Sequence, residues 1–297
     1  MSSLINWVEA TRPRTLPAAL IPVLLASSMA TVDGCFNWIA TVICLSFAVS
    51  IQVGTNFAND YLDGVKGADK KRSLGPRRAV GSGLISPSKM KKAAILSLSV
   101  GFCIGLGLIP FGGWWLLIVG VASVACAWLY TGGPYPLAYH GLGDVFVVFF
   151  FGFVAAGFTY YVQAKTFSWQ VLLLGLSSGL LINNLLLINN YRDADEDRTV
   201  KKNTLVVILG RNFALVQYFA SLFVPGMVVL VFWFNGYGPF ILLALFPLAY
   251  GIILRQRLQT ANTIYDFSGV LKDYSAKVVL GYGLLFSAGL LMKPIIS

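Results

Sequence analysis

Two short segments of the chain concentrate side-chain oxygen atoms at the end of an apolar stretch. Their amide and carboxylate residues are Asn56, Asn59, Asp60 and Asp63 in the first segment, and Asn189, Asn190, Asp193 and Asp197 in the second. If each segment is helical, spacings of three and four residues place most of these oxygens on one helix face. Oxygen ligands of this kind are typical of Mg²⁺, which is held by one or two carboxylates together with substrate phosphates. The spacing therefore predicts two oxygen-rich helix ends suited to magnesium.

Basic residues flank both acidic segments. They are Lys66, Lys70, Lys71, Arg72, Arg77 and Arg78 beside the first, and Arg192, Arg198, Lys201 and Lys202 beside the second. Guanidinium and ammonium donors next to a magnesium site are what a diphosphate requires. For any single lysine, plain positive charge at a membrane surface is the simpler explanation. Arg77 and Arg78, in a segment rich in turn-forming residues, have the stronger claim.

The acidic residues themselves have a plainer explanation, in which charged side chains merely end helices in water. Carboxylates at a helix C-terminus oppose the helix dipole, however, and bound cations would explain their presence there. The two segments also resemble each other, and this similarity places Asp63 opposite Asp193. We expect two equivalent helices that face each other across a central cavity.

The elements that must position these residues are membrane helices. The chain has 297 residues, of which 57% are hydrophobic and only 11% charged, which excludes an ordinary water-soluble fold and a disordered chain. Stretches of roughly 20 apolar residues predict transmembrane helices. We predict an all-α, multi-pass membrane protein in which residues 1–297 form a single domain. Its nine expected spans lie near 16–32, 38–58, 93–109, 114–130, 143–161, 169–189, 213–234, 239–254 and 275–296.

The distribution of charge predicts the orientation of these spans. With nine spans, all Lys and Arg residues except Lys165 and Lys293 fall on one side, which the positive-inside rule assigns to the cytoplasm. The N-terminus and the loops 59–92 and 190–212 are then cytoplasmic, in the inner membrane of a cell. The net charge of +10 is thereby explained by topology, so nucleic acid is not an expected partner. One histidine and four cysteines without CxxC spacing disfavour zinc or a disulfide framework.

A diphosphate at the boundary of an intramembrane cavity implies a substrate with a long apolar tail. Isoprenoid diphosphates meet that description. Magnesium bound to the diphosphate makes it a better leaving group, and the allylic C–O bond can then ionise to a carbocation. Preorganised charges and aromatic rings stabilise such a cation.

The combined motifs resemble the UbiA superfamily of intramembrane aromatic prenyltransferases, and within it the bacterial 1,4-dihydroxy-2-naphthoate polyprenyltransferases of menaquinone synthesis. The similarity lies in the two acidic segments and in the segments 12–17, 66–69, 74–76, 130–144 and 202–207. It implies nine helices around a central cavity, Mg²⁺ as cofactor, and transfer of a polyprenyl group from its diphosphate to the naphthoate ring. The products implied are demethylmenaquinone, carbon dioxide and diphosphate.

The resemblance also implies roles for individual residues. Metal and diphosphate ligands would be Asn56, Asn59, Asp60, Asp63, Asp193 and Asp197, the four aspartates being catalytic. Diphosphate contacts would come from Lys66, Arg77, Arg78, Arg198 and Lys202. Polar candidates for holding the acceptor are Tyr130, Tyr139, Asp144, Asn183 and Asn184, although hydrogen bonding between helices explains the two asparagines equally well. Many family members carry an acid at the position of Gly67, and the roles of Asp69, Asn189 and Asn190 stay open.

Other functions remain to be weighed against this one. A related enzyme would prenylate 4-hydroxybenzoate or homogentisate, and only segment 130–144 favours naphthoate. A membrane phosphatase for isoprenoid diphosphates would share the metal site without needing an acceptor. A secondary transporter would place its ionisable residues near the middle of the bilayer, whereas these acids cluster at one boundary.

Overall fold

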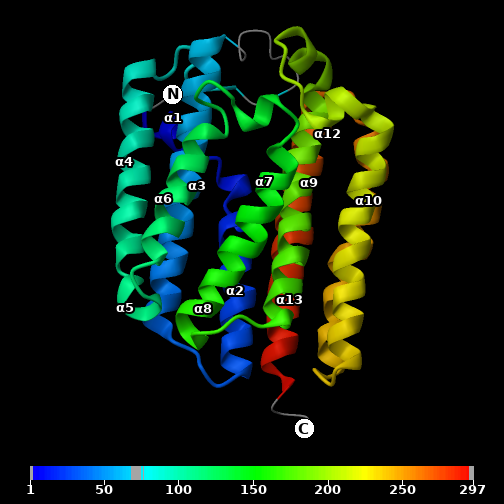
Figure 1. Cartoon of the computed structure of the whole chain (residues 1–297). Helices are drawn as coiled ribbons and strands as arrows, with labels where there is room; N and C mark the ends of the chain where they lie inside the picture. The colour runs from blue at the N-terminus through cyan, green and yellow to red at the C-terminus, as the bar shows by residue number, and fades with distance from the viewer. Residues whose placement is uncertain (1–2, 68–74, 76, 294–297) are drawn as a thin grey trace.

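The computed structural model describes residues 3–67, 75 and 77–293, and within them the chain is helical with no β-strand (Figure 1). The α-helices are α1 (Ser3–Ala10), α2 (Pro17–Val32), α3 (Trp38–Lys66), α4 (Pro87–Leu106), α5 (Ile109–Gly112), α6 (Leu116–Leu129), α7 (Gly143–Val147), α8 (Ala155–Ala164), α9 (Trp169–Thr199), α10 (Leu205–Phe234), α11 (Leu245–Thr260), α12 (Ile264–Asp273) and α13 (Leu280–Leu291). Short 3₁₀ or π-helical segments complete them: η1 (Pro13–Thr15), η2 (Leu137–Tyr139), η3 (Val148–Val154), η4 (Pro239–Ala244) and η5 (Tyr274–Val279).

Six of the helices in the described part of the chain are long and apolar enough to cross a membrane, or seven if α1–η1 and α2, bent by 47°, count as one span. The predicted stretches 93–109 and 114–130 are also helical, as α4 and α6. They fall short of that criterion because α4 carries Lys89, Lys91 and Lys92 near its start and α6 has only 14 residues. The prediction of a multi-pass helical protein is thus confirmed.

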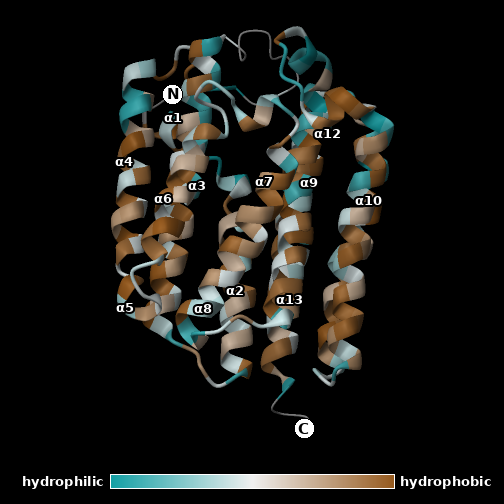
Figure 2. Ribbon diagram, in the orientation of Figure 1, coloured by the Kyte–Doolittle hydropathy of each residue, from teal (hydrophilic) through white to brown (hydrophobic). Residues whose placement is uncertain are grey.

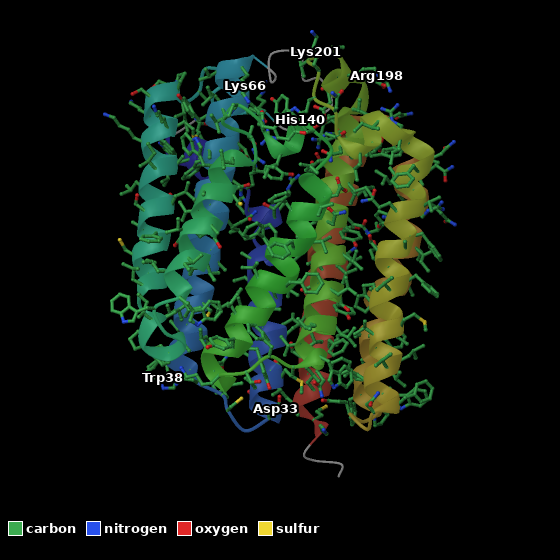
Figure 3. All side chains as sticks on the ribbon, viewed as in Figure 1. Asp33, Trp38, Lys66, His140, Arg198 and Lys201 are labelled. Carbon is green, nitrogen blue, oxygen red and sulfur yellow. The ribbon has the colours of Figure 1, made fainter. Side chains whose placement is uncertain are left out.

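The outer surface of the bundle is suited to lipid. Apolar residues cover most of the length of the helices, and polar residues gather at one end of the bundle (Figure 2). We call this the motif end, because it carries Lys66 and Arg198, while Asp33 and Trp38 mark the opposite, far end (Figure 3). Trp114 is 77% exposed beside α5 at the far end, where Trp38 is 66% exposed. Exposed tryptophans at one level of a bundle are typical of a membrane–water interface.

The two long helices α3 and α9 carry the acidic segments without interruption. Asn37 caps α3 by accepting the N–H of Ala40, and α3 ends at Gly67, whose φ of 75° is accessible to glycine. Ser168 caps α9 in the same way through the N–H of Val171. Both helices extend beyond the predicted spans 38–58 and 169–189. The two acidic segments are therefore helical, which is the condition under which their oxygens share a helix face.

Glycines hold the helix formed by α7, η3 and α8 close against α9, the most buried of the candidate spans. A Cβ atom at Gly152 would lie 2.5 Å from the carbonyl oxygen of Gly175, and one at Gly179 would lie 2.7 Å from that of Val148. Small residues permit this backbone approach, as is usual between membrane helices. The contact brings the beginning of α7 beside the middle of α9.

Candidate active site

A small polar cavity of about 80 Å³ lies at the motif end, between the ends of α3 and α9. Asp63 of α3 and Asp193 of α9 both line it, and each is more than nine-tenths buried. Asn59, Asn189 and Asn190 add amide groups to the same walls. The two acidic segments therefore meet at one cavity, as the similarity between them predicts.

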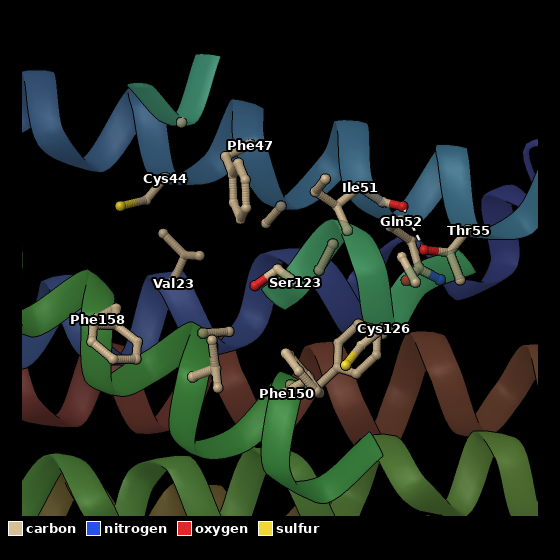
Figure 4. A pocket seen from close by; sticks show the side chains of 18 of the residues that line it. Val23, Cys44, Phe47, Ile51, Gln52, Thr55, Ser123, Cys126, Phe150 and Phe158 are labelled. Atoms are coloured by element: carbon tan, nitrogen blue, oxygen red, sulfur yellow. Dashed lines mark hydrogen bonds between the residues drawn. The ribbon is translucent and has the colours of Figure 1, made fainter. Parts of the chain in front are cut away.

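A larger, mostly apolar cavity of about 290 Å³ runs beside α3 toward the far end (Figure 4). Phe47 and Ile51 of α3 line it together with Ser123 of α6 and Phe150 of η3. Its lining residues on α3 extend from position 44 to position 59, and a helical rise of 1.5 Å per residue makes that distance about 22 Å. The cavity thus has the length and chemistry to hold an extended hydrocarbon chain.

The two cavities share part of their walls. Arg12, Asn59, Tyr130 and Asn189 line both of them, so the polar cavity adjoins the apolar one. The Tyr130 hydroxyl can donate a hydrogen bond at the junction.

The Asp63 carboxylate is held by the side chain of Tyr139, whose ring lies near two lysine ammonium groups. The Tyr139 hydroxyl donates a hydrogen bond to Asp63 Oδ1 at 2.8 Å. The ammonium groups of Lys66 and Lys202 lie 4.6 and 5.8 Å from the centre of the Tyr139 ring. Lys66 Nζ also donates to the carbonyl of Thr131 at 2.6 Å. These contacts collect positive charge around one carboxylate at the entrance to the polar cavity.

Asp193 makes a buried ion pair with its neighbour in the sequence. Arg192 donates from Nε to Oδ1 at 2.5 Å and from Nη2 to Oδ2 at 2.8 Å, and both side chains are 2% exposed. Asp197 lies one helical turn further and is 3.5 Å from Lys202 Nζ. A bidentate pair of this kind fixes the orientation of the carboxylate.

Asp60 has different surroundings from the other acidic residues. Its Oδ2 and Oδ1 atoms accept the backbone N–H groups of Ala79 and Val80, each at 3.0 Å, and Asp60 is not among the residues lining either cavity. It thereby fastens the segment that places Arg78 in the wall of the polar cavity. This tether departs from the common face predicted with Asp63, and a metal-binding role for Asp60 stays a prediction.

The remaining predicted basic residues, and Asn56 of the first acidic segment, do not all lie at the polar cavity. Arg78 and Lys202 line the polar cavity, whereas Arg77 and Arg198 are exposed and are absent from its lining. Asn56 lines the apolar cavity and donates to the carbonyl of Thr11 at 2.9 Å. Asp69 lies outside the described residues.

The candidate acceptor residues are also separated by the fold. Tyr130 and Asp144 line the polar cavity, and Asn183 reaches it indirectly by donating to Asp144. Asn184 instead donates to the Tyr218 carbonyl and the Tyr274 hydroxyl within the packed core, and it lines neither cavity. Both asparagines therefore make hydrogen bonds between helices, as the alternative predicts, and Asn183 makes its bond to a residue that lines the polar cavity.

Arg12 and Gln217 are among the residues at the site that were not predicted as site residues. Arg12, in the left-handed conformation with φ 55°, lines both cavities from the bend between α1 and η1. Gln217 of α10 donates to Asp144 at 2.7 Å. The segment 12–17, which contains Arg12, is part of the resemblance to the UbiA superfamily. Its position in the sequence, however, does not indicate that it lies near the acidic segments. Gln217 lies within an apolar stretch, where only its polarity distinguishes it.

The donor atoms of the polar cavity fit magnesium. The carboxylates of Asp63, Asp144 and Asp193 and several amide oxygens supply hard oxygen ligands, and neither histidine nor cysteine lines the cavity. In the described part of the chain, no three His, Cys, Asp or Glu side chains form a closed metal cluster.

The fold and the site define an intramembrane prenyltransferase. The chain belongs to the UbiA prenyltransferase family, whose model matches residues 19–264. More particularly, it is 40% identical over 231 residues to the 1,4-dihydroxy-2-naphthoate octaprenyltransferase of Mycobacterium leprae, with 78% of each chain covered. The Escherichia coli K12 enzyme of the same name is 38% identical over 232 residues, with 75% of this chain and 74% of that one covered.

Solved structures share the fold. A UbiA homologue from Aeropyrum pernix in its apo form superposes with a TM-score of 0.67 at 16% identity, covering 99% of both chains. A homologue from Archaeoglobus fulgidus bound to GPP and Mg²⁺ superposes with a TM-score of 0.66 at 13% identity, covering 96% of this chain and 99% of that one.

Proposed function

We propose that this protein transfers a polyprenyl group from polyprenyl diphosphate to 1,4-dihydroxy-2-naphthoate, with Mg²⁺ as cofactor. The observation that carries the proposal is the meeting of Asp63 and Asp193 at a polar cavity that adjoins an apolar one. A diphosphate requires the polar cavity, and its isoprenoid tail requires the apolar one. The names of the relatives and the Mg²⁺ bound by a homologue support the same reaction.

The side chains of the polar cavity have complementary roles in this reaction. Asp63 and Asp193 would hold Mg²⁺, which when bound neutralises the leaving diphosphate. Arg78 and Lys202 would contact the remaining phosphate oxygens, and Arg12, which lines both cavities, would lie near the first prenyl carbon. Mg²⁺ specificity and the catalytic role of Asp197 belong to this proposal as well, whereas Asp60 anchors the segment that carries Arg78.

The chemical outcome follows from an ionised allylic C–O bond. The naphthoate carbon that bears the carboxyl group forms a C–C bond with the prenyl carbon, while the electron pair of the C–O bond leaves with diphosphate. Loss of CO₂ from the same ring carbon restores aromaticity and gives demethylmenaquinone in its reduced form. The apolar cavity excludes water from the cation, which would otherwise be hydrolysed.

The location of the reaction is part of the proposal. We infer nine spans in a cytoplasmic membrane, with the N-terminus and the motif end on the cytoplasmic side. The support is the concentration of Lys and Arg at that end, together with the tryptophans of the far end. Tagging of either terminus followed by labelling from one side of the membrane tests this orientation.

One assay separates the candidate functions. Purified protein is incubated with Mg²⁺, octaprenyl diphosphate and each of three acceptors, namely 1,4-dihydroxy-2-naphthoate, 4-hydroxybenzoate and homogentisate, and the products are identified by mass spectrometry. We expect prenylation and decarboxylation of the naphthoate. A prenylated benzoate would reassign the acceptor, and release of diphosphate with polyprenol alone would identify a phosphatase. Absence of any reaction, together with uptake of a solute by vesicles that contain the protein, would identify a transporter.

A further inference from the structure

Asp144 is a buried carboxylate in the wall of the polar cavity, separate from the two acidic segments. It lies in the first turn of α7 and is 7% exposed. Arg12 and Arg78 line the same cavity.

Two amides fix this carboxylate through one of its oxygens. Asn183 Nδ2 of α9 donates to Asp144 Oδ1 at 3.0 Å, and Gln217 Nε2 of α10 donates to the same atom at 2.7 Å. Besides these two amides and the backbone N–H of Asp144 itself, no group in the described part of the chain donates to this carboxylate. Because both amides turn their N–H groups toward the carboxylate, the group is an acceptor. The second carboxylate oxygen, Oδ2, thus belongs to a residue that lines the polar cavity.

A phenol lies beside this carboxylate. The Tyr130 hydroxyl is 2.9 Å from the position that a Cβ atom would take at Gly143, the residue before Asp144. Glycine at position 143 therefore lets Tyr130 approach the start of α7. Tyr130, a hydroxyl donor, and Asp144, a carboxylate acceptor, therefore line the same polar cavity.

We propose that Asp144 is the catalytic residue that accepts the proton of the acceptor hydroxyl next to the attacked ring carbon. This inference rests on the proposed function and identifies the part of the site that binds the acceptor. As the C–C bond forms, the hydroxyl proton passes to Asp144 Oδ2 and the ring oxygen becomes a carbonyl. When CO₂ leaves, its electron pair returns to the ring and the same proton returns to that oxygen. Protons and electrons balance without a further reactant.

The substitution Asp144→Asn separates this role from a structural one. Asparagine keeps an oxygen for Asn183 and Gln217 but offers the cavity an N–H donor in place of an acceptor. We expect kcat to fall about 100-fold or more, as is typical for loss of a general base, with the KM for polyprenyl diphosphate and the Tm unchanged. Asp33→Asn is the matched control, because Asp33 accepts a hydrogen bond from Tyr160 at the far end and should leave activity unchanged.

Binding provides the second measurement. The unsubstituted protein should bind 1,4-dihydroxy-2-naphthoate about tenfold more tightly than 4-hydroxy-2-naphthoate, which lacks the relevant hydroxyl. Asp144→Asn should remove that preference. If this variant does not fold, Gln217→Leu takes its place, and the KM for the acceptor should rise several-fold while the KM for the donor is retained.

The outcomes are distinct. A kcat of Asp144→Asn within threefold of the unsubstituted value would overturn the role of Asp144, and so would equal increases in the KM for donor and for acceptor. Either result would leave the proposed function intact. Failure of the unsubstituted protein to prenylate 1,4-dihydroxy-2-naphthoate would instead overturn the proposed function itself. Loss of kcat and of the hydroxyl preference together supports the inference.

Discussion

The carboxylate of Asp60 and the backbone of Val80 are joined by a 3.0 Å hydrogen bond, and the N–H of Ala79 occupies the second oxygen of the same carboxylate. Asp60 is 3% exposed, so water does not compete for these bonds. This contact connects the first acidic segment to the segment that carries Arg78. An acidic motif therefore supplies both a residue in the cavity wall and an anchor for a basic loop.

Replacing the anchor should loosen this basic loop. We expect Asp60→Asn to lower the free energy of unfolding by about 1–3 kcal/mol, because a charged acceptor of two buried N–H groups is lost. Trypsin should then cleave after Arg77 and Arg78 more rapidly, and the KM for polyprenyl diphosphate should rise. Asp33→Asn is the control. An increased Mg²⁺ requirement with unchanged proteolysis would show that Asp60 is a metal ligand and not an anchor.

The carboxylates at the polar cavity should be indispensable. Asp63→Asn and Asp193→Asn should each lower kcat by about 100-fold or more, since each removes a charged oxygen ligand from the proposed metal site. Product formation and elution of the folded protein in detergent measure activity and integrity separately. Asp195→Asn is the matched control, because the Asp195 side chain is 72% exposed and pairs with Arg211 outside the cavity. Equal effects of all three substitutions would contradict the assignment.

Activity should depend on a divalent cation. EDTA should abolish prenyl transfer and excess Mg²⁺ should restore it. The carboxylates and the diphosphate are all anions, so a cation must neutralise their charge where they meet. The measurement is product formation against free Mg²⁺ concentration. Transfer that continues in EDTA would remove the metal from the proposal.

Tyr139 should act through Asp63. Tyr139→Phe keeps the ring beneath Lys66 and Lys202 but deletes the 2.8 Å hydrogen bond to Asp63. We expect the Mg²⁺ concentration for half-maximal activity to rise about tenfold, corresponding to one charge-assisted hydrogen bond. Tyr250→Phe deletes a similar bond, to Asp273, away from the cavities. It should not change the Mg²⁺ dependence, and a shift in both variants would indicate a general loss of stability.

The apolar cavity should discriminate between donors by length. Ser123 lines it seven residues before Tyr130 on α6, a distance of about 10 Å. Ser123→Phe should therefore lower kcat/KM for octaprenyl diphosphate while sparing dimethylallyl diphosphate, whose chain ends before that point. Ser99→Phe, on an exposed part of α4, is the control. Equal losses for both donors would show that the tail lies elsewhere.

Several features could be predicted because they depend on local pattern. The hydrophobic stretches predict the helices, and the distribution of charge predicts that acidic and basic residues gather at one end. Spacing along single helices predicts that Asp63 and Asp193 present oxygens at helix ends. These inferences need only helical geometry and the cost of placing charge in lipid.

The orientation of each side chain about its helix depends on neighbours distant in the sequence. Asp60 and Asp63 differ by about 60° around α3, which leaves both compatible with one face until the loop at Val80 binds Asp60. Asn183 and Asn184 are adjacent in the chain, yet one contacts Asp144 and the other the core tyrosines.

The sequence by itself thus determined the helices, the polar end and the chemistry of magnesium and diphosphate. Tertiary packing alone decided which polar groups share a cavity, because the glycine contacts between η3 and α9 bring Asp144 beside Asn183. Such contacts depend on backbone distances between separate helices, and the order of residues along one helix does not encode them.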